Sequence, residues 1–420
     1  MIVVIVMIVT VREVVGSECI IAGGNDGLSS TSDLHAPDRL RFSLDLFREV
    51  YARSSPESNV VISPESVWGG LLLAYLASSG RTQRQMEQVL GFHDKSSALG
   101  TWRLLQHMWG EDAGNSSLAV VNRVFVDPRL VLNQCVADRL TDELSTVDFL
   151  QYREAAAGIN RMVSEWTQGR LGNLVQPDDL QNALMVLVSA AAFRGTWVER
   201  FPVPDTALAR FFTHLHRFTH VPTMVLSTRL RYGESSVLGA SVLELPYSGG
   251  SWSMFLLLPD LAPHLASPHL GQPHLASPHL GLDGLLSRLT PAALRSAVGD
   301  MSPRQVTVEV PRFKVDFALK DNLKRVLYDL GISELFSKSA DLTALAPYGD
   351  LVVSQSLHQA SLEVTEEGTQ AAAATAFISL ARSRPPPPIS FQCNRPFVFL
   401  VYDNLSASIM FIGAYRRPQE

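Results

Sequence analysis

The sequence predicts an α+β fold built on large antiparallel sheets. Apolar residues recur at helical spacing in the first part of the chain, whereas strand-like apolar runs dominate the later part. Of the 420 residues, 46% are hydrophobic and 18% are charged, which is enough apolar material for a large core. Length alone suggests two or three domains. No charge block or long polar linker divides the chain, so one large domain is the alternative.

The N-terminal stretch MIVVIVMIVTVREVVGSEC predicts a signal peptide over residues 1–17. Its apolar run of about 11 residues is too short to span a bilayer, and Val-Gly-Ser at 15–17 offers the small residues that a signal peptidase prefers. A β-strand or a misassigned start is the alternative, because no Lys or Arg precedes the run and Arg-Glu at 12–13 interrupts its end. Residues 18–36 have the composition of a flexible mature N-terminus. We therefore expect a secreted, extracellular protein.

The early elements follow from periodicity and helix caps. Asp38 can cap a helix whose apolar residues recur at helical spacing, namely Leu40, Leu44, Phe47 and Tyr51. Residues 59–77 predict a short strand, a proline-marked turn and a buried helix. Thr82 and Gln85 match a capping box, and Gly91 predicts the end of the helix that follows.

Strands make up most of the rest. Residues 159–171 predict an amphipathic helix, and another helix is expected at 283–289. A Gly-Gly pair predicts a hairpin turn in one strand-like segment, and one continuously apolar run predicts a strand buried on both faces. The strand-like segments are 118–127, 184–197, 242–259, 306–317 and 395–415. Of these, 184–197 is the continuously apolar run, and 242–259 contains the Gly-Gly pair.

The segment PHLASPHLG occurs at 263–271 and again at 273–281, within a predicted insertion over 262–281. Metal binding is one interpretation of its histidines, which are His264, His269, His274 and His279. We favour a slipped-repeat insertion in a surface loop, because repeated proline prevents a helix or strand from preorganising those imidazoles. We therefore expect no metal site.

Composition and missing motifs exclude several functions. The net charge of −6, without a Lys/Arg stripe, argues against nucleic acid. The widely spaced cysteines, Cys19, Cys135 and Cys393, are odd in number and predict no disulfide framework. No G-x-S-x-G, H-E-x-x-H, G-x-x-x-x-G-K-[ST], G-x-G-x-x-G or C-x-x-C motif occurs. We expect no enzyme and no cofactor, although scattered Ser, His and Asp could meet in space. Sequons at Asn115 and Asn404 predict glycosylation.

Five motifs follow one another over residues 37–417, and they are NVVISPESVWGGLLLA, SAAAFRGTW, VEVPRFKVD, LHQASLEVTEEGTQAAAAT and CNRPFVF. In this order they resemble the motifs of the serpins, a family of serine protease inhibitors. The resemblance implies one serpin domain, with about eight or nine helices around three β-sheets and an exposed loop over 366–388 that contains the hinge and the reactive centre. It places the following residues in the shutter and breach of the central sheet: Ser63, Ser66, Ser189, Trp197 and His358.

Within the family, LARS before the prolines, VLELPY and NRPFVF resemble the branch of plasminogen activator inhibitors and protease nexin, clade E. Most serpins carry asparagine where this chain has Ser189, and a serine there is similar to the third member of that branch.

The resemblance implies that a protease cleaves the loop and forms an acyl-enzyme, after which the loop inserts into the central sheet as a new strand. The implied hinge consists of Glu366, Glu367, Gly368, Thr369, Gln370, Ala371, Ala372, Ala373, Ala374 and Thr375. In a strand, alternate side chains face the same side. The ones that would become buried, Thr369, Ala371, Ala373 and Thr375, are all small and uncharged.

Family spacing from Gly368 places the reactive bond at Arg382–Ser383. Arg384 is the competing candidate, but proline follows it, which makes a poor bond for trypsin-like proteases. The resemblance therefore implies a monomeric suicide substrate that traps a trypsin-like serine protease of the plasminogen-activator, thrombin or trypsin type. The alternatives are a non-inhibitory serpin that acts as a binding or chaperone protein, and a secreted hydrolase.

The segment TWRLLQHMWGEDAG (101–114), where the branch's basic heparin-binding residues are expected, holds only Arg103 and His107. We expect weak heparin activation or none, and no membrane partner.

Overall fold

The computed structural model describes residues 37–111, 117–214, 217–260, 281–348, 351–368 and 387–418. Within these ranges lie nine α-helices, which are α2 (Pro37–Arg53), α3 (Pro64–Ala77), α4 (Gly80–Leu90), α5 (Lys95–Glu111), α6 (Gln134–Arg139), α7 (Tyr152–Trp166), α8 (Leu282–Arg288), α9 (Pro291–Gly299) and α10 (Asp321–Asp329). Short 3-10 turns are η1 (Phe149–Gln151), η2 (Pro177–Leu180) and η3 (Val203–Asp205).

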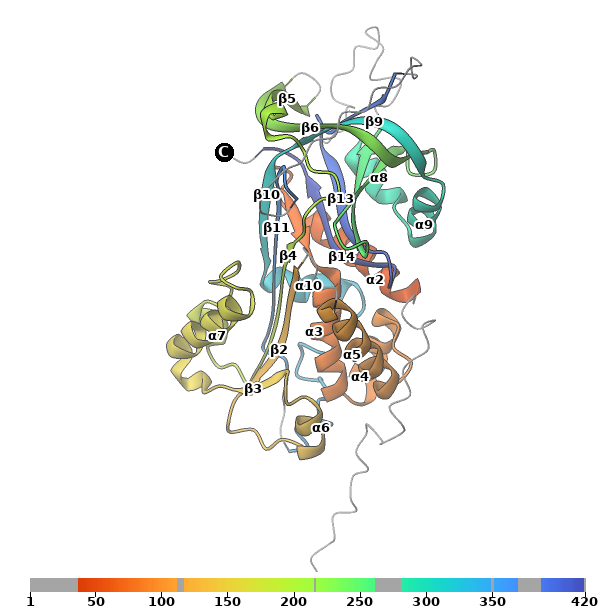
Figure 1. Ribbon diagram of the computed structural model, residues 1–420. Helices are drawn as coiled ribbons and strands as arrows, with labels where there is room; N and C mark the ends of the chain where they lie inside the picture. Colours follow the sequence, from red (N-terminus) through yellow and green to blue (C-terminus); the bar gives the residue numbers. More distant parts are fainter. Residues whose placement is uncertain are drawn as a thin grey trace, which may run out of the picture.

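The strands of the described residues form two sheets (Figure 1). The five-stranded sheet has the order β10 (Phe313–Leu319), β11 (Gln355–Val364), β4 (Met185–Arg194), β2 (Ser117–Val126) and β3 (Leu144–Thr146). The nine-stranded sheet has the order β1 (Val60–Ile62), β14 (Ser408–Tyr415), β13 (Phe397–Asp403), β8 (Trp252–Pro259), β7 (Ala240–Pro246), β6 (Arg217–Ser235), β9 (Ser302–Pro311) and β12 (Ile389–Gln392), with β5 (Ala207–His214) paired to β6.

The five-stranded sheet is covered on both faces. Helix α7 lies on one face, and α3 lies on the other with α4 and α5 beside it (Figure 1). Strand β4 alternates between two cores: Val186 and Val188 pack with α7, whereas Met185 and Leu187 pack with the α3 side. The prediction that this apolar run is a strand buried on both faces is therefore confirmed.

The nine-stranded sheet depends on one long strand. Strand β6 has 19 residues; its first part pairs with β5 and its later part pairs with β7 and β9. The family resemblance implies three sheets. Because β6 joins two of them into one, the described strands form two sheets. A third core, rich in aromatic rings, lies between the two sheets and includes Phe193 from β4, Val364 from β11 and Phe399 from β13.

Most of the predicted elements are present, and two boundary signals are wrong. Gly91 ends α4 in the left-handed conformation, at φ 73°, as predicted. Asp38 lies inside the first turn of α2 and does not cap it. Thr82 and Gln85 do not form a capping box, because α4 already begins at Gly80. The Gln85 amide oxygen instead accepts the backbone N–H of Ser333, at 3.1 Å.

Helix α7 begins seven residues before the predicted 159 and ends at Trp166. The reason is that Ala155 and Ala156 also bury their small side chains against the sheet, although they give a weak hydrophobic signal in the sequence. Strands β9 and β10 divide the predicted 306–317 run at Arg312, and each joins a different sheet.

Candidate functional site

The structure brings four of the predicted residues together, Ser63, Ser66, Ser189 and His358, and places Trp197 beyond the end of β4. We name the first region the shutter and the second the breach. Both regions lie along the seam between β4 and β11. These strands are parallel, and the register places Ser189 opposite His358.

His358 holds three elements together at the shutter. Its Nε2 accepts the backbone N–H of Ser63 at 3.1 Å, at the start of α3. Its Nδ1 lies 3.3 Å from the hydroxyl oxygen of Ser189. That hydroxyl in turn donates to the carbonyl oxygen of Leu357, at 3.3 Å. Because Nε2 is an acceptor, the ring is neutral with its proton on Nδ1.

The serine–histidine pair of the shutter is structural. His358 is fully buried and Ser189 is 5% exposed, so a substrate cannot reach the hydroxyl. Burial, only partly offset by the Ser189 backbone, lowers the pKa of His358 to about 3. A catalytic base near neutral pH needs a pKa near 7, so this contact does not support the hydrolase alternative.

Ser63 and Ser66 begin α3 beneath the seam. The Ser63 hydroxyl accepts the backbone N–H of Ser66 at 3.3 Å and caps the helix. The Ser66 hydroxyl lies 3.2 Å from the side-chain amide of Asn122 on β2. Asn122 is paired with Ser189 in the sheet register. Asn122 was not among the predicted residues; its only signal is the polar pair Asn122–Arg123 within the otherwise apolar run LAVVNRVFV.

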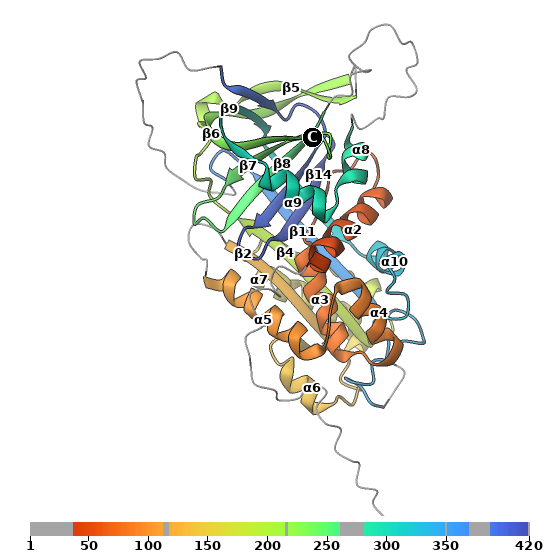
Figure 2. The same ribbon diagram turned by 90° about the vertical axis from the view of Figure 1, so that its right-hand side faces the viewer.

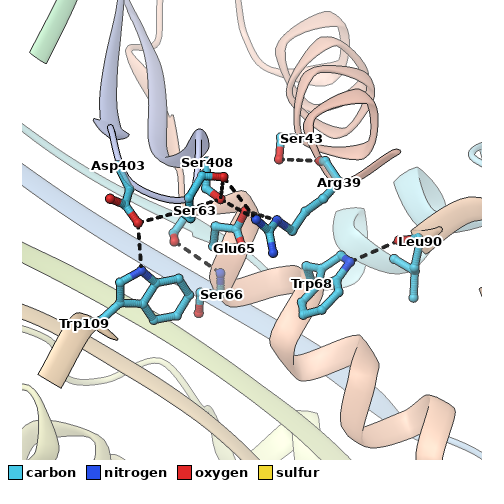
Figure 3. Close-up of polar contacts among 11 residues, drawn as sticks. Arg39, Ser43, Ser63, Glu65, Ser66, Trp68, Leu90, Trp109, Asp403 and Ser408 are labelled. Carbon is cyan, nitrogen blue, oxygen red and sulfur yellow. Dashed lines mark hydrogen bonds and ion pairs between the residues drawn. The ribbon is translucent and has the colours of Figure 1, made fainter. Parts of the chain in front are cut away.

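A buried ionic cluster lies beside the shutter and was also missed (Figure 3). Glu65, between the two shutter serines, contacts the Arg39 guanidinium of α2 at 3.2 Å. Arg39 also donates to the hydroxyl of Ser408, at 2.8 Å. Asp403 accepts the indole N–H of Trp109 at 3.3 Å. Burial raises the pKa of Glu65, and the nearby Asp403 adds to this effect, although Arg39 opposes it. The cluster ties α2, α3 and β14 to the base of the shutter.

Trp197 closes the breach. Its indole N–H donates to the carbonyl oxygen of Thr365 at 3.0 Å, and its backbone N–H donates to the carbonyl oxygen of Glu367 at 3.1 Å. Its ring stacks on Tyr247 with centroids 4.3 Å apart. The side chain that follows β4 is thus bonded to the chain that leaves β11.

The described part of the hinge, Glu366 to Gly368, is docked at the breach. The Glu366 carboxylate accepts the Thr206 hydroxyl at 2.9 Å. Gly368 has φ 121°, and a Cβ at this position would lie 2.2 Å from the carbonyl oxygen of Gly195. Only glycine fits this backbone without strain. Thr365 and Gly368 exchange two backbone hydrogen bonds, at 2.9 and 3.2 Å, so the chain reverses direction there.

Several predicted features lie outside the described residues. They are the signal peptide and N-terminal segment, Asn115, the His/Pro insertion up to residue 280, the hinge from Thr369 to Thr375, and the reactive bond Arg382–Ser383. Asn404 is exposed in the turn between β13 and β14, and its glycosylation stays a prediction.

The cysteines differ from the expectation. Cys393 is free and buried, and burial raises the pKa of its thiol. Cys135, at the start of α6, is disulfide-bonded. Wide spacing and an odd count cannot reveal which cysteines the fold brings together.

Among the described residues, no group of His, Cys, Asp and Glu is arranged to hold a metal ion. No helix in that part of the chain is both long and apolar enough to cross a membrane.

The profile of the family "Serpin (serine protease inhibitor)" matches residues 38–418, so the chain belongs to the serpin family. It is 33% identical to the leukocyte elastase inhibitor of Sus scrofa, over 90% of this chain and 98% of that protein. It is 31% identical to Iripin-2 of Ixodes ricinus, over 89% and 91%. Among solved structures, Serpin48 of the insect Tenebrio molitor has a TM-score of 0.77 at 26% identity and covers 93% of this chain and 100% of that one.

The fold prediction is therefore confirmed. Members of this family act in general as protease inhibitors and not as catalysts, and a serine protease is the expected partner.

The buried His358 predicts that stability falls on acidification. Its folded pKa of about 3 lies below the unfolded value of about 6.5, so the unfolded chain binds the proton more tightly between these values. Stability is thus lost as the pH falls below about 6.5. As the pH falls from 7 to 5, the His358 imidazole should lower the free energy of unfolding by about 2 kcal/mol. Urea denaturation at a series of pH values measures this change. In a His358→Gln variant this part of the pH dependence should disappear; an unchanged pH profile would contradict the assignment.

Proposed function

We propose that this protein is a secreted inhibitor of trypsin-like serine proteases that acts as a suicide substrate with the reactive bond Arg382–Ser383. The observation that carries the proposal is the geometry at the end of β11. The chain reverses at Thr365–Gly368, and Gly368 forms an antiparallel bridge with Thr196, directly beyond β4.

The strand directions favour insertion between β4 and β11. A segment inserted directly after Gly368 would run antiparallel to β11, because the turn reverses the chain. Since β4 is parallel to β11, the same segment would also be antiparallel to β4. It could therefore hydrogen-bond to both neighbours without a crossover connection. The small, uncharged residues at alternate hinge positions support this proposal, because burying a charge there would cost several kcal/mol.

Further observations support the finer parts of the proposal. The disulfide at Cys135 is typical of an oxidising compartment and supports secretion, together with the sequons at Asn115 and Asn404 and the N-terminal apolar run. Arg382 fits a primary pocket that contains a buried carboxylate. The motifs LARS, VLELPY and NRPFVF support a place near the plasminogen activator inhibitor and protease nexin branch.

The direct test is to incubate the purified protein with trypsin, thrombin and urokinase and to run a denaturing gel. We expect an SDS-stable band near the summed masses with at least one of them, and a released peptide that begins at Ser383. Arg382→Glu should slow trapping by roughly 30- to several thousand-fold, because it removes one side of a buried charge pair worth ~2–5 kcal/mol. Cleavage at Arg382 without any complex would instead indicate a non-inhibitory serpin.

Two hinge variants with the same charge change test insertion itself. Ala373→Glu places a carboxylate on the side of the inserted strand that becomes buried, whereas Ala372→Glu places it on the opposite side. We expect Ala373→Glu to be cleaved with little trapping, and Ala372→Glu to retain trapping. The measurement is the number of inhibitor molecules consumed per protease molecule trapped. Equal values for the two variants would contradict strand insertion.

Heparin should accelerate inhibition less than a hundredfold. Arg103 and His107 are the only basic residues on α5 after Lys95, and Lys95 is buried with its ammonium group bonded to the carbonyl oxygen of Leu76 at 3.2 Å. Few cations therefore remain on α5 for a polyanion. The measurement is the second-order inhibition rate constant across a heparin titration. A gain of about a hundredfold or more would overturn this expectation.

A further inference from the structure

The hairpin formed by β5 and β6 carries an exposed patch that has no role in the mechanism above. We name it the hairpin patch, and it consists of Leu208, Arg210, Phe212, Phe218, His220 and Pro222. Figure 2 shows β5 at the end of the molecule opposite α6.

The strand register places these side chains on one face. Leu208 is paired with Pro222, Arg210 with His220 and Phe212 with Phe218. Directly opposed residues of an antiparallel pair, and residues two apart along a strand, share a face. The residues between them lie on the other face, where Phe211 and Val221 are buried in the core and Thr219 is exposed. The patch is therefore the outer face of the hairpin.

Apolar and aromatic groups are unusually exposed there. Leu208 is 70% exposed and Phe218 is 43% exposed. The Phe218 ring lies 5.8 Å from Phe212 and 5.5 Å from His220, centroid to centroid, and the Arg210 guanidinium lies 4.8 Å from its centroid. The Phe218 ring is thus in contact with Phe212, His220 and Arg210 on the same face. A contiguous exposed apolar patch with a polar rim typically marks an interaction site, and aromatic residues and arginine are enriched at interface centres.

The charge of the hairpin has one sign. Residues 206–222 contain Arg210, Arg217 and three histidines but no Asp or Glu, in a chain whose net charge is −6. Neither arginine forms an ion pair with a described residue. The surface therefore fits a partner that presents apolar groups edged by carboxylates.

The hairpin is bonded to both described ends of the reactive segment. Thr206, which precedes β5, donates its hydroxyl to Glu366 at 2.9 Å, on the hinge side. On the other side, the backbone N–H of Phe212 donates to the carbonyl oxygen of Asn394 at 2.7 Å, just beyond β12. A macromolecule that binds the segment between these ends would lie beside the hairpin patch.

We propose that the hairpin patch is a second contact surface for the target protease, and that it docks an acidic, partly apolar region of the protease outside its active site. The inference rests on the proposed function, because the occupant of the reactive segment must be a protease. It adds a recognition element that Arg382 cannot supply, since many proteases accept arginine.

The test uses the double variant Arg210→Glu/Phe218→Ser. Both side chains are exposed, so the fold should be retained. The matched control, Leu150→Ser/Arg153→Glu, makes the same kinds of change on η1 and α7, where Leu150 is 68% exposed and Figure 1 shows α7 far from β5. For trypsin, thrombin and urokinase, we expect the patch variant to reduce the inhibition rate constant of at least one protease by about tenfold or more. The control should change it less than twofold. Changes below twofold for all three proteases would overturn the proposal.

Binding to proteases whose catalytic serine is replaced by alanine separates docking at the hairpin patch from covalent trapping at the reactive bond. These proteases cannot form the acyl-enzyme, so the Kd reports docking alone. If active proteases are not trapped but the patch variant still weakens this Kd, the suicide mechanism fails and the docking surface stands. If trapping occurs but the patch variant leaves the Kd unchanged, the docking surface fails. Loss of heparin binding by the patch variant, with protease binding intact, would assign the patch to a polysaccharide and overturn the proposal.

Discussion

The direct, parallel pairing of β4 with β11 is the constraint on which the rest of the structure depends. It places Ser189 opposite His358 and brings the end of β11 to Trp197. Both faces of the shutter half of this seam are covered, by α7 on one side and α3 on the other, whereas the face near Arg194 and Glu363 opens into a surface pocket. Separating the two strands would require the shutter and the breach to release their hydrogen bonds together.

The shutter is specific because its polar groups are buried and must be satisfied. His358 has an acceptor role toward Ser63 and a donor role toward Ser189, and an unpaired buried nitrogen would cost about 1–3 kcal/mol. Asn122 extends the network to β2, and the Arg39–Glu65 pair extends it to α2. Ser189 and the three alanines that follow it on β4 have small side chains. Hydrogen bonds of Ser189 to Leu357 and His358 therefore contribute to holding the centre of the seam closed. Small side chains on β4 are also compatible with a strand that enters beside them.

Local signals were sufficient for much of the fold. Gly91 as a helix end and the Gly-Gly hairpin follow from backbone conformations that few residues adopt. The predicted capping box is wrong because α4 already begins at Gly80. Gln85 instead bonds to Ser333, which is distant in the sequence, and a local motif holds no information about such a partner.

The candidate site could be predicted only in part, because a local motif does not show which distant residues pack against it. The family resemblance named Ser63, Trp197 and His358, and the structure places all three along the seam between β4 and β11; their roles in loop insertion stay a prediction. Asn122 and the Arg39–Glu65 pair were missed, because their roles arise only when β2, α2 and α3 are packed together. The disulfide at Cys135 could not be predicted from spacing.

The central claim is that β4 and β11, which pair directly in the intact chain, can separate and admit the cleaved loop as a new strand between them. The most direct measurement is the thermal unfolding midpoint of the intact chain and of the chain cleaved at Arg382, with the two fragments left associated. The account predicts a large rise in the midpoint after cleavage, because the inserted strand adds hydrogen bonds to both β4 and β11. An equal or lower midpoint in the cleaved form would contradict insertion at this seam.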